Sequence, residues 1–119
     1  MNIKEFRIGN LLQENNTKEI IEVLKLSKDE LFLSGNFKRE WQAEPIPLTE
    51  EWLLKFGLIY NDENYWELVG AHISLEWDGM KDWDILCMDE WLMSLKYVHQ
   101  LQNLYFALTG SELSIQPKA

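Results

Sequence analysis

Carboxylates are the most numerous side chains in this sequence that are able to do chemistry, and they are concentrated in one segment. Residues 60–91 contain nine of the 20 acidic residues and a single basic residue, Lys81, so this segment carries a net charge of −8. The whole chain carries −9, which leaves the remainder nearly balanced. Carboxylates bind cations, transfer protons or complement basic partners. Segregation of charge on this scale indicates a partner or an ion.

The pattern of residues 72–88 predicts how these carboxylates are presented. Residues 72–78 and 83–88 are expected to pair as a hairpin through a tight turn at residues 79–81. One face then carries only apolar cross-strand pairs: Ile73 with Cys87, Leu75 with Ile85, and Trp77 with Trp83. The other face pairs Ser74 with Leu86, Glu76 with Asp84, and Asp78 with Asp82. Each like-charge pair costs about 0.2–1 kcal/mol, which is less than the roughly 1.5–3 kcal/mol gained per buried apolar side chain.

The hairpin therefore gathers Glu76, Asp78, Asp82 and Asp84 on one face as candidate partner-binding residues. Their expected spacing is of the same order as that of charges along a nucleic-acid backbone, so such a face could occupy a basic groove built for phosphates. The alternative interpretation is a solvated strand face that keeps a small protein soluble and protects a sheet edge against aggregation.

Tryptophans accompany this acidic segment. The hairpin register sends Trp77 and Trp83 to the apolar face, where a core position is favoured. Trp66 and Trp91 are the better candidates for exposed anchors at a binding surface, and so is Trp41.

No motif in the sequence indicates catalysis, a metal or a cofactor. The acidic turn at residues 78–84 lacks the ligand spacing of a calcium loop, and His72 and His99 lack the spacing of zinc ligands. Cys87 is expected to be an inert thiol in an apolar strand. Nucleotide-binding and serine-hydrolase motifs do not occur. We therefore expect a non-enzymatic protein without cofactor, catalytic residue or metal site.

Composition limits the class of protein further. The 119 residues, 46% of them hydrophobic, predict one globular domain over residues 1–119. A sequence pI near 4.6 argues against direct binding of nucleic acid and favours basic partners. The sequence shows neither a transmembrane segment nor a signal peptide, so we expect a cytoplasmic location without membrane contact.

The elements that must position the acidic residues are predicted from periodicity and end signals. We expect an N-terminal antiparallel meander over residues 6–34, a helix over 50–56, the acidic hairpin over 72–88 and a C-terminal helix over 95–108. Thr49 is the expected N-cap of the first helix, and Gly57 and Gly110 are the expected stop signals of the two helices. These elements predict an α+β fold in which two helices pack on an antiparallel sheet of five or six strands.

Three segments carry a resemblance that covers most of the chain in order. They are Arg7-Ile8-Gly9-Asn10, residues 45–57 (PIPLTEEWLLKFG) and residues 96–110 (KYVHQLQNLYFALTG). The chain resembles a group of small proteins encoded by bacteriophages, prophages and mobile elements, for which no catalytic residues are known. The match is loosest over residues 61–93, which include the acidic hairpin. The resemblance implies a phage setting, in which small acidic proteins often block host defence nucleases, as some anti-CRISPR proteins do by occupying nucleic-acid channels.

Two main functions from different classes follow, and a small hydrolase that uses a carboxylate pair or a divalent ion is a third alternative. The first is a non-enzymatic acidic binding module that inhibits or modulates a basic nucleic-acid-handling host protein, such as a defence nuclease, by nucleic-acid mimicry. Its contacts would come from Glu76, Asp78, Asp82, Asp84, Trp66 and Trp91. The second is a structural or assembly protein of a phage-like element, in which acidity serves only solubility and the chain self-associates through an apolar patch.

Overall fold

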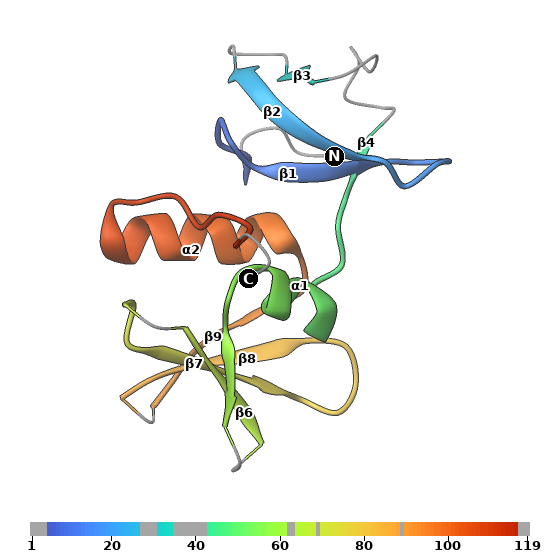
Figure 1. Cartoon of the computed structure of the whole chain (residues 1–119). Coiled ribbons are helices and arrows are strands. Elements are labelled where there is room, and N and C mark those ends of the chain that lie inside the picture. Colours follow the sequence, from blue (N-terminus) through green and yellow to red (C-terminus); the bar gives the residue numbers. More distant parts are fainter. Residues whose placement is uncertain are drawn as a thin grey trace. The chain divides into compact units, whose positions relative to one another are not determined.

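The computed structural model describes residues 5–26, 31–34, 43–61, 64–68, 70–88 and 90–116. The fold is α+β, as predicted: these residues form nine strands and two helices. The strands make two antiparallel sheets, one of four strands and one of five, where the sequence analysis expected a single sheet (Figure 1). The chain divides into two compact units, one of Met1–Ile46 with Tyr97–Asn103 and the other of Pro47–Lys96 with Leu104–Ala119. The single domain over residues 1–119 stays a prediction.

The first unit contains the four-stranded sheet, in the order β3-β2-β1-β4. Its strands are β1 (Leu11–Glu14), β2 (Ile20–Leu26), β3 (Leu31–Leu33) and β4 (Ala43–Pro45). Consecutive pairing of β1, β2 and β3 confirms the antiparallel meander. A cluster of buried apolar side chains forms the core of this unit: Phe6, Leu12, Ile21, Val23, Leu33 and Ala43.

The first strand begins at Leu11, five residues later than the meander predicted from Phe6 onward. Residues 7–10 are taken up by a turn, because the Asn10 backbone N–H donates to the Arg7 carbonyl at 3.0 Å. The Asn10 side-chain oxygen also accepts the Arg7 backbone N–H at 2.6 Å. Gly9 has φ +95°, a conformation that glycine adopts without strain.

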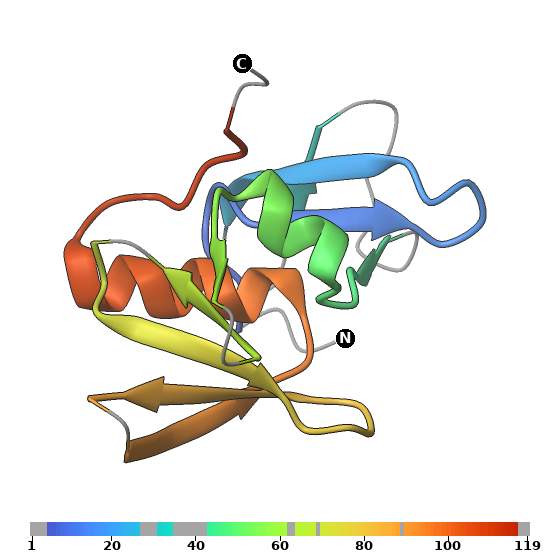
Figure 2. The ribbon, with the colours of Figure 1, turned by 60° about the horizontal axis from the view of Figure 1, so that its bottom comes forward.

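The second unit contains the five-stranded sheet, in the order β5-β6-β7-β8-β9. Its strands are β5 (Ile59–Asn61), β6 (Tyr65–Leu68), β7 (Ile73–Trp77), β8 (Trp83–Cys87) and β9 (Glu90–Leu95). Strand β9 was not predicted from the sequence, and it pairs with β8 as the last strand of this sheet (orange in Figure 2). One backbone edge of β9 therefore has no neighbouring strand among the described residues.

Helix α1 (Glu50–Lys55) belongs to the second unit and closely follows the prediction. Thr49 occupies the N-cap position in an extended conformation, although its side chain makes no capping hydrogen bond. Phe56 closes the helix through its N–H, which donates to the Trp52 carbonyl at 3.0 Å, and Gly57 follows with φ +85°. The apolar face formed by Trp52, Leu53 and Phe56 is buried, as the helical spacing predicts.

Helix α2 (Val98–Thr109) begins three residues later than the predicted start at residue 95. Leu95 is still part of β9, where it pairs with Trp83. The Lys96 carbonyl then accepts the Leu48 N–H at 2.8 Å, so these two residues are held in extended structure. The stop signal is confirmed, because Gly110 follows the helix with φ +77°.

Candidate functional site

The predicted hairpin register is confirmed, and it brings two of the candidate carboxylates together. Strands β7 and β8 pair Glu76 with Asp84, while Leu75 pairs with Ile85 and Trp77 with Trp83. Side chains alternate between the two faces of a strand, so Glu76 and Asp84 lie on the face opposite to the apolar ladder. We call this the outer face of the five-stranded sheet.

Asp84 is held in place by two neighbours from β9. Its Oδ1 accepts a hydrogen bond from the Ser94 hydroxyl at 2.8 Å and a long one from the Trp91 indole Nε1 at 3.4 Å. The pairing of Asp84 with Ser94 extends the row that starts at Glu76 across a third strand. The carboxylate of Asp84 is thus half-buried and oriented, whereas Glu76 is exposed.

Asp78 has a different role, because its carboxylate organises the hairpin turn. Its Oδ1 accepts the backbone N–H groups of Met80, Lys81 and Asp82 at 2.7–3.2 Å. The hydrogen bond from Met80 is the main cause that lowers the pKa of Asp78 below its usual value. One oxygen of this carboxylate is therefore already used within the turn.

Asp82 completes the turn. Its carbonyl oxygen accepts the Asp78 N–H at 3.1 Å. Its side chain is half-buried, and the buried Oδ1 has no hydrogen-bond partner among the described residues. The four predicted acids therefore divide into one pair on the outer face and one pair in the turn.

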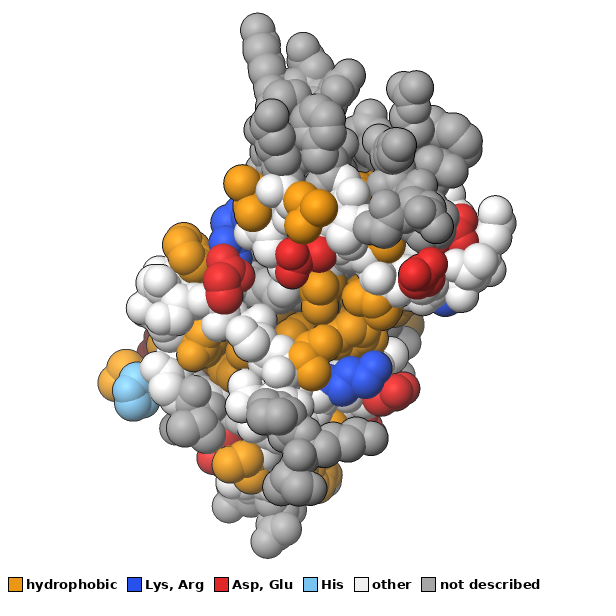
Figure 3. Space-filling view, turned by 45° about the horizontal axis from the view of Figure 1, so that its top comes forward, with side chains coloured by type: hydrophobic (Ala, Val, Ile, Leu, Met, Phe, Trp, Pro, Cys, Tyr) orange, Lys and Arg blue, Asp and Glu red, His pale blue; other side chains and the backbone are white. Residues whose placement is uncertain are grey.

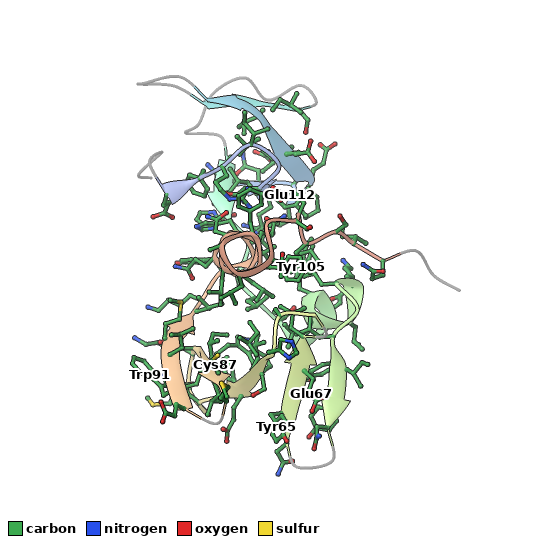
Figure 4. All side chains as sticks on the ribbon, turned by 90° about the vertical axis from the view of Figure 1, so that its left-hand side faces the viewer. Tyr65, Glu67, Cys87, Trp91, Tyr105 and Glu112 are labelled. Atoms are coloured by element: carbon green, nitrogen blue, oxygen red, sulfur yellow. The ribbon has the colours of Figure 1, made fainter. Side chains whose placement is uncertain are left out.

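A second row of residues crosses the outer face beside the first. Strand pairing places Glu67 of β6 next to Ser74 of β7, Ser74 next to Leu86 of β8, and Leu86 next to Trp91 of β9. Figure 4 labels Glu67 on β6 and Trp91 on β9. With strands about 4.7–4.9 Å apart, the row spans roughly 14–15 Å from an exposed carboxylate to an exposed indole.

This second row borders a hollow of about 400 Å³. Its lining includes Glu67, Ser74 and Leu86 of the row, together with His72 and Met88 at the strand ends. His72 and Met88 have φ of +57° and +53°, a conformation that residues other than glycine adopt rarely. The volume lies within the range of small-molecule pockets, and the carboxylate of Glu67 makes the hollow suited to a cationic group.

The two predicted tryptophan anchors have different outcomes. Trp91 is 63% exposed, so its predicted exposure is confirmed. The prediction for Trp66 is wrong: this side chain is 6% exposed, because Trp66 pairs with Leu75 and so shares the core face of the sheet. Trp41 lies outside the described residues.

The outer-face carboxylates are not neutralised within the described part of the chain. No lysine or arginine there forms an ion pair with Glu67, Glu76 or Asp84; the lysine ion pairs are Lys18 with Glu44 and Lys55 with Glu51. On the face shown in Figure 3, acidic side chains (red) form separate patches rather than one continuous area. Asp62, Glu63 and Asp89 of the acidic segment lie outside the described residues.

Among the described residues, no group of three or more histidine, cysteine, aspartate or glutamate side chains is arranged to hold a metal ion. Cys87 is half-buried at the end of β8. His99 is 1% exposed, with its Nε2 3.0 Å from Glu5 Oε1, and burial lowers the pKa of His99 while Glu5 opposes that shift. His99 packs between the rings of Phe6 and Tyr97.

Two of the segments that carry the resemblance meet in a polar network inside the first unit. Gln102 is buried, and its side chain accepts the Leu11 N–H at 2.9 Å and donates to the Gly9 carbonyl at 3.3 Å. Asn103 Oδ1 accepts hydrogen bonds from Asn10 Nδ2 at 2.8 Å and from Arg7 Nε at 2.9 Å. These residues therefore hold the N-terminal turn against the start of α2.

Ser74 and Leu86 lie opposite each other on the outer face, as the hairpin register predicts, whereas Glu67 was not predicted there. The alternation of residues 65–68 predicts that Glu67 lies on the opposite face from Trp66 and Leu68. Which face of the sheet that is depends on the strand that pairs with β6. Only the pairing of Glu67 with Ser74 assigns Glu67 to the same face as Glu76.

Comparison of the chain with protein-family models, with curated proteins and with solved structures gives no match. Within the described residues, neither helix combines the length and the apolar character needed to cross a membrane.

Proposed function

We propose that this chain is a non-enzymatic, acidic protein-binding module that inhibits or modulates a basic, nucleic-acid-handling host protein. The partner would be a protein such as a defence nuclease, in the cytoplasm of a host cell that carries a phage or mobile element. The carrying observation is the outer face of the five-stranded sheet, where Glu67, Glu76 and Asp84 lie without ion pairs to described basic residues, next to the exposed Trp91.

Electrostatics supports this type of partner. Unpaired carboxylates steer a basic protein toward the face and repel nucleic acid. Glu76 and Asp84 are directly opposite across two strands, where side chains stand about 4.5–5.5 Å apart. This spacing is close enough to phosphate spacing for a groove of lysines and arginines to accept the carboxylates in place of phosphates.

The exposed indole supplies the second component of a binding surface. Trp91 borders the acidic row through its hydrogen bond to Asp84. A large aromatic side chain beside charged groups is typical of binding hot spots, because burying it provides the affinity while the charges set orientation and rate. Glu67, Glu76 and Trp91 are therefore the proposed contact residues, with Asp84 holding Trp91 in place.

Reversing the charge of Glu67 and Glu76 is expected to weaken binding of the partner. We expect the E67K/E76K variant to bind it at least about tenfold more weakly at low salt, because two attractions become repulsions. Both side chains are exposed, so the fold is expected to persist. The measurement is affinity capture from a bacterial lysate with mass spectrometry, followed by titration of the captured protein with and without duplex DNA as competitor.

The matched control is E19K/E22K, which makes the same change in net charge at exposed residues of the first unit. It should retain the partner if the outer face is the binding surface. Equal capture by wild type and E67K/E76K, or a captured protein that duplex DNA does not compete away, would contradict the proposal.

A second candidate function, a structural or assembly protein, is favoured by strand β9. This edge strand exposes Trp91, Leu92 and Met93 and carries a single charged residue, Glu90. Edge strands of this kind pair with other chains unless charges or prolines protect them.

For this second function, Leu92→Lys is expected to convert a self-associated form into monomer, since the added charge protects the edge. Light scattering at two ionic strengths measures the mass, and wild-type association should not respond to salt. Leu54→Lys, at another exposed leucine, is the matched control and should leave the mass unchanged. A wild-type chain that is monomeric under all conditions would exclude self-association.

A further inference from the structure

A second cavity lies on the core face of the five-stranded sheet and is walled by aromatic rings. It has a volume of about 230 Å³, and its walls include Tyr60, Trp66, Trp77 and Trp83. Strand pairing places these four residues on the same face, opposite to that of Asp84 and Glu67. The cavity is thus distinct from the hollow on the outer face.

The rings form two tilted pairs. Tyr60 and Trp66 have ring centroids 5.2 Å apart with planes at 59°, and Trp77 and Trp83 are 5.2 Å apart at 57°. One buried member is held by a hydrogen bond, because Trp83 Nε1 donates to the Leu48 carbonyl at 2.8 Å. Each aromatic ring carries a negatively polarised π face, to which a cation is attracted.

The outer members of both pairs are unusually open for aromatic side chains. Tyr60 is 51% exposed and Trp77 is 44% exposed. The prediction of a core position for Trp77 is wrong: the side chain lies on the apolar face opposite Trp83 but is largely open to solvent. Two large rings left half in water beside a cavity are typical of a binding site rather than of a completed core.

The polar residues at the cavity carry negative charge or accept hydrogen bonds. Glu50, in the first turn of α1, lines the cavity and forms no ion pair among the described residues. Asn64 also lines it and accepts the Tyr60 hydroxyl hydrogen bond at 3.1 Å. Glu76 contributes to the lining as well, whereas no described lysine or arginine does.

We propose that this cavity binds an alkylammonium group, with preference for a methylated one. Cations within about 6 Å of an aromatic ring centroid are attracted to its face, and cages of several rings with a nearby carboxylate recognise quaternary ammonium and methyl-lysine groups. Methylation lowers the hydration that an ammonium must lose on entering the cavity, whereas a primary ammonium is strongly hydrated. This inference does not depend on the proposed function, because the aromatic walls of the cavity lie on the core face and only Glu76 belongs to both sites.

The test compares probes that differ in charge but not in shape. Choline and its uncharged carbon analogue, 3,3-dimethylbutan-1-ol, are titrated into the full chain while the tryptophan indole N–H resonances are followed by NMR. We expect choline to bind at least about tenfold more tightly than the alcohol and to shift the signals of the cavity tryptophans. Equal binding of the two probes, or no shift with choline at millimolar concentrations, would overturn the proposal.

Two further probes distinguish the source of the group. A peptide with trimethyllysine that binds more tightly than choline identifies a protein side chain as the ligand, whereas choline binding more tightly identifies a free small molecule. The same peptide with unmodified lysine should bind more weakly than the methylated one. If the two peptides and the neutral alcohol all bind alike, the aromatic cavity is not an ammonium site.

Variants assign the effect to the cavity. Trp77→Ala should weaken choline binding at least about tenfold and Glu50→Gln about threefold, because the first removes a ring and the second a charge. Trp91→Ala, at an exposed tryptophan on the outer face, is the control and should bind choline normally. Glu50 is exposed, so E50Q keeps the test valid even if W77A destabilises the fold. Conversely, Glu67→Lys should affect the basic partner but not choline.

Discussion

Ile85→Ala is expected to lower the free energy of unfolding by about 2–5 kcal/mol. Ile85 is fully buried on β8, between Leu75 of β7 and Met93 of β9. Its truncation removes buried apolar surface and leaves a cavity. The residues next to Ile85 cannot fill this cavity, because strand pairing holds them in place. Since small domains are stable by only about 5–15 kcal/mol, a loss of this size is a large fraction of the total stability. Urea denaturation followed by tryptophan fluorescence measures it.

The adjacent leucine provides the matched control. Leu86 follows Ile85 in the same strand but points to the outer face and is half-buried. Leu86→Ala should therefore cost less than half as much as Ile85→Ala. Equal losses at the two positions would mean that the two faces of the sheet do not differ in packing, which contradicts the basis of the acidic outer face.

Gln102→Leu is expected to lower the free energy of unfolding by about 2–4 kcal/mol, although the two side chains are similar in size. The amide of Gln102 satisfies the Leu11 N–H and the Gly9 carbonyl. Leucine leaves both groups without partners in the interior of the first unit, at roughly 1–3 kcal/mol per buried group. Chemical denaturation measures the loss, and amide exchange at Leu11 should be accelerated.

The same replacement at Gln13 serves as control. Gln13 is half-buried on β1, and its side chain makes no hydrogen bond within the described part of the chain. Gln13→Leu should change stability by less than about 0.5 kcal/mol, as is usual for positions without special contacts. If Gln102→Leu is equally mild, the polar network does not hold the N-terminal turn against α2.

Local patterns account for the parts of the fold that the sequence analysis predicted. The β7–β8 register follows from strict alternation on both sides of a turn with Gly79 at φ +87°, because any slip by one residue would expose the apolar ladder. The boundaries of α1 follow from Thr49 and Gly57 in the same way. These signals act over a few residues, so they can be read from the chain alone.

Parts of the candidate sites depend on partners that are distant in sequence. Trp66 was expected to be exposed, but its pairing with Leu75 buries it. The start of α2 was placed too early because Leu95 pairs with Trp83. Strand β9 was missed because Trp91, Leu92 and Met93 form a continuous apolar run, which lacks the alternation by which strands are recognised.

By itself, the sequence determined the class of the fold, the acidic segment and the two-sided character of the β7–β8 hairpin. Only the tertiary structure decided that Glu67 joins the outer face, that Trp91 lies beside Asp84, and that four aromatic residues line one cavity. The physical reason is that alternation along a strand sorts side chains into two sets, whereas pairing between strands decides which set faces the core and which residues become neighbours.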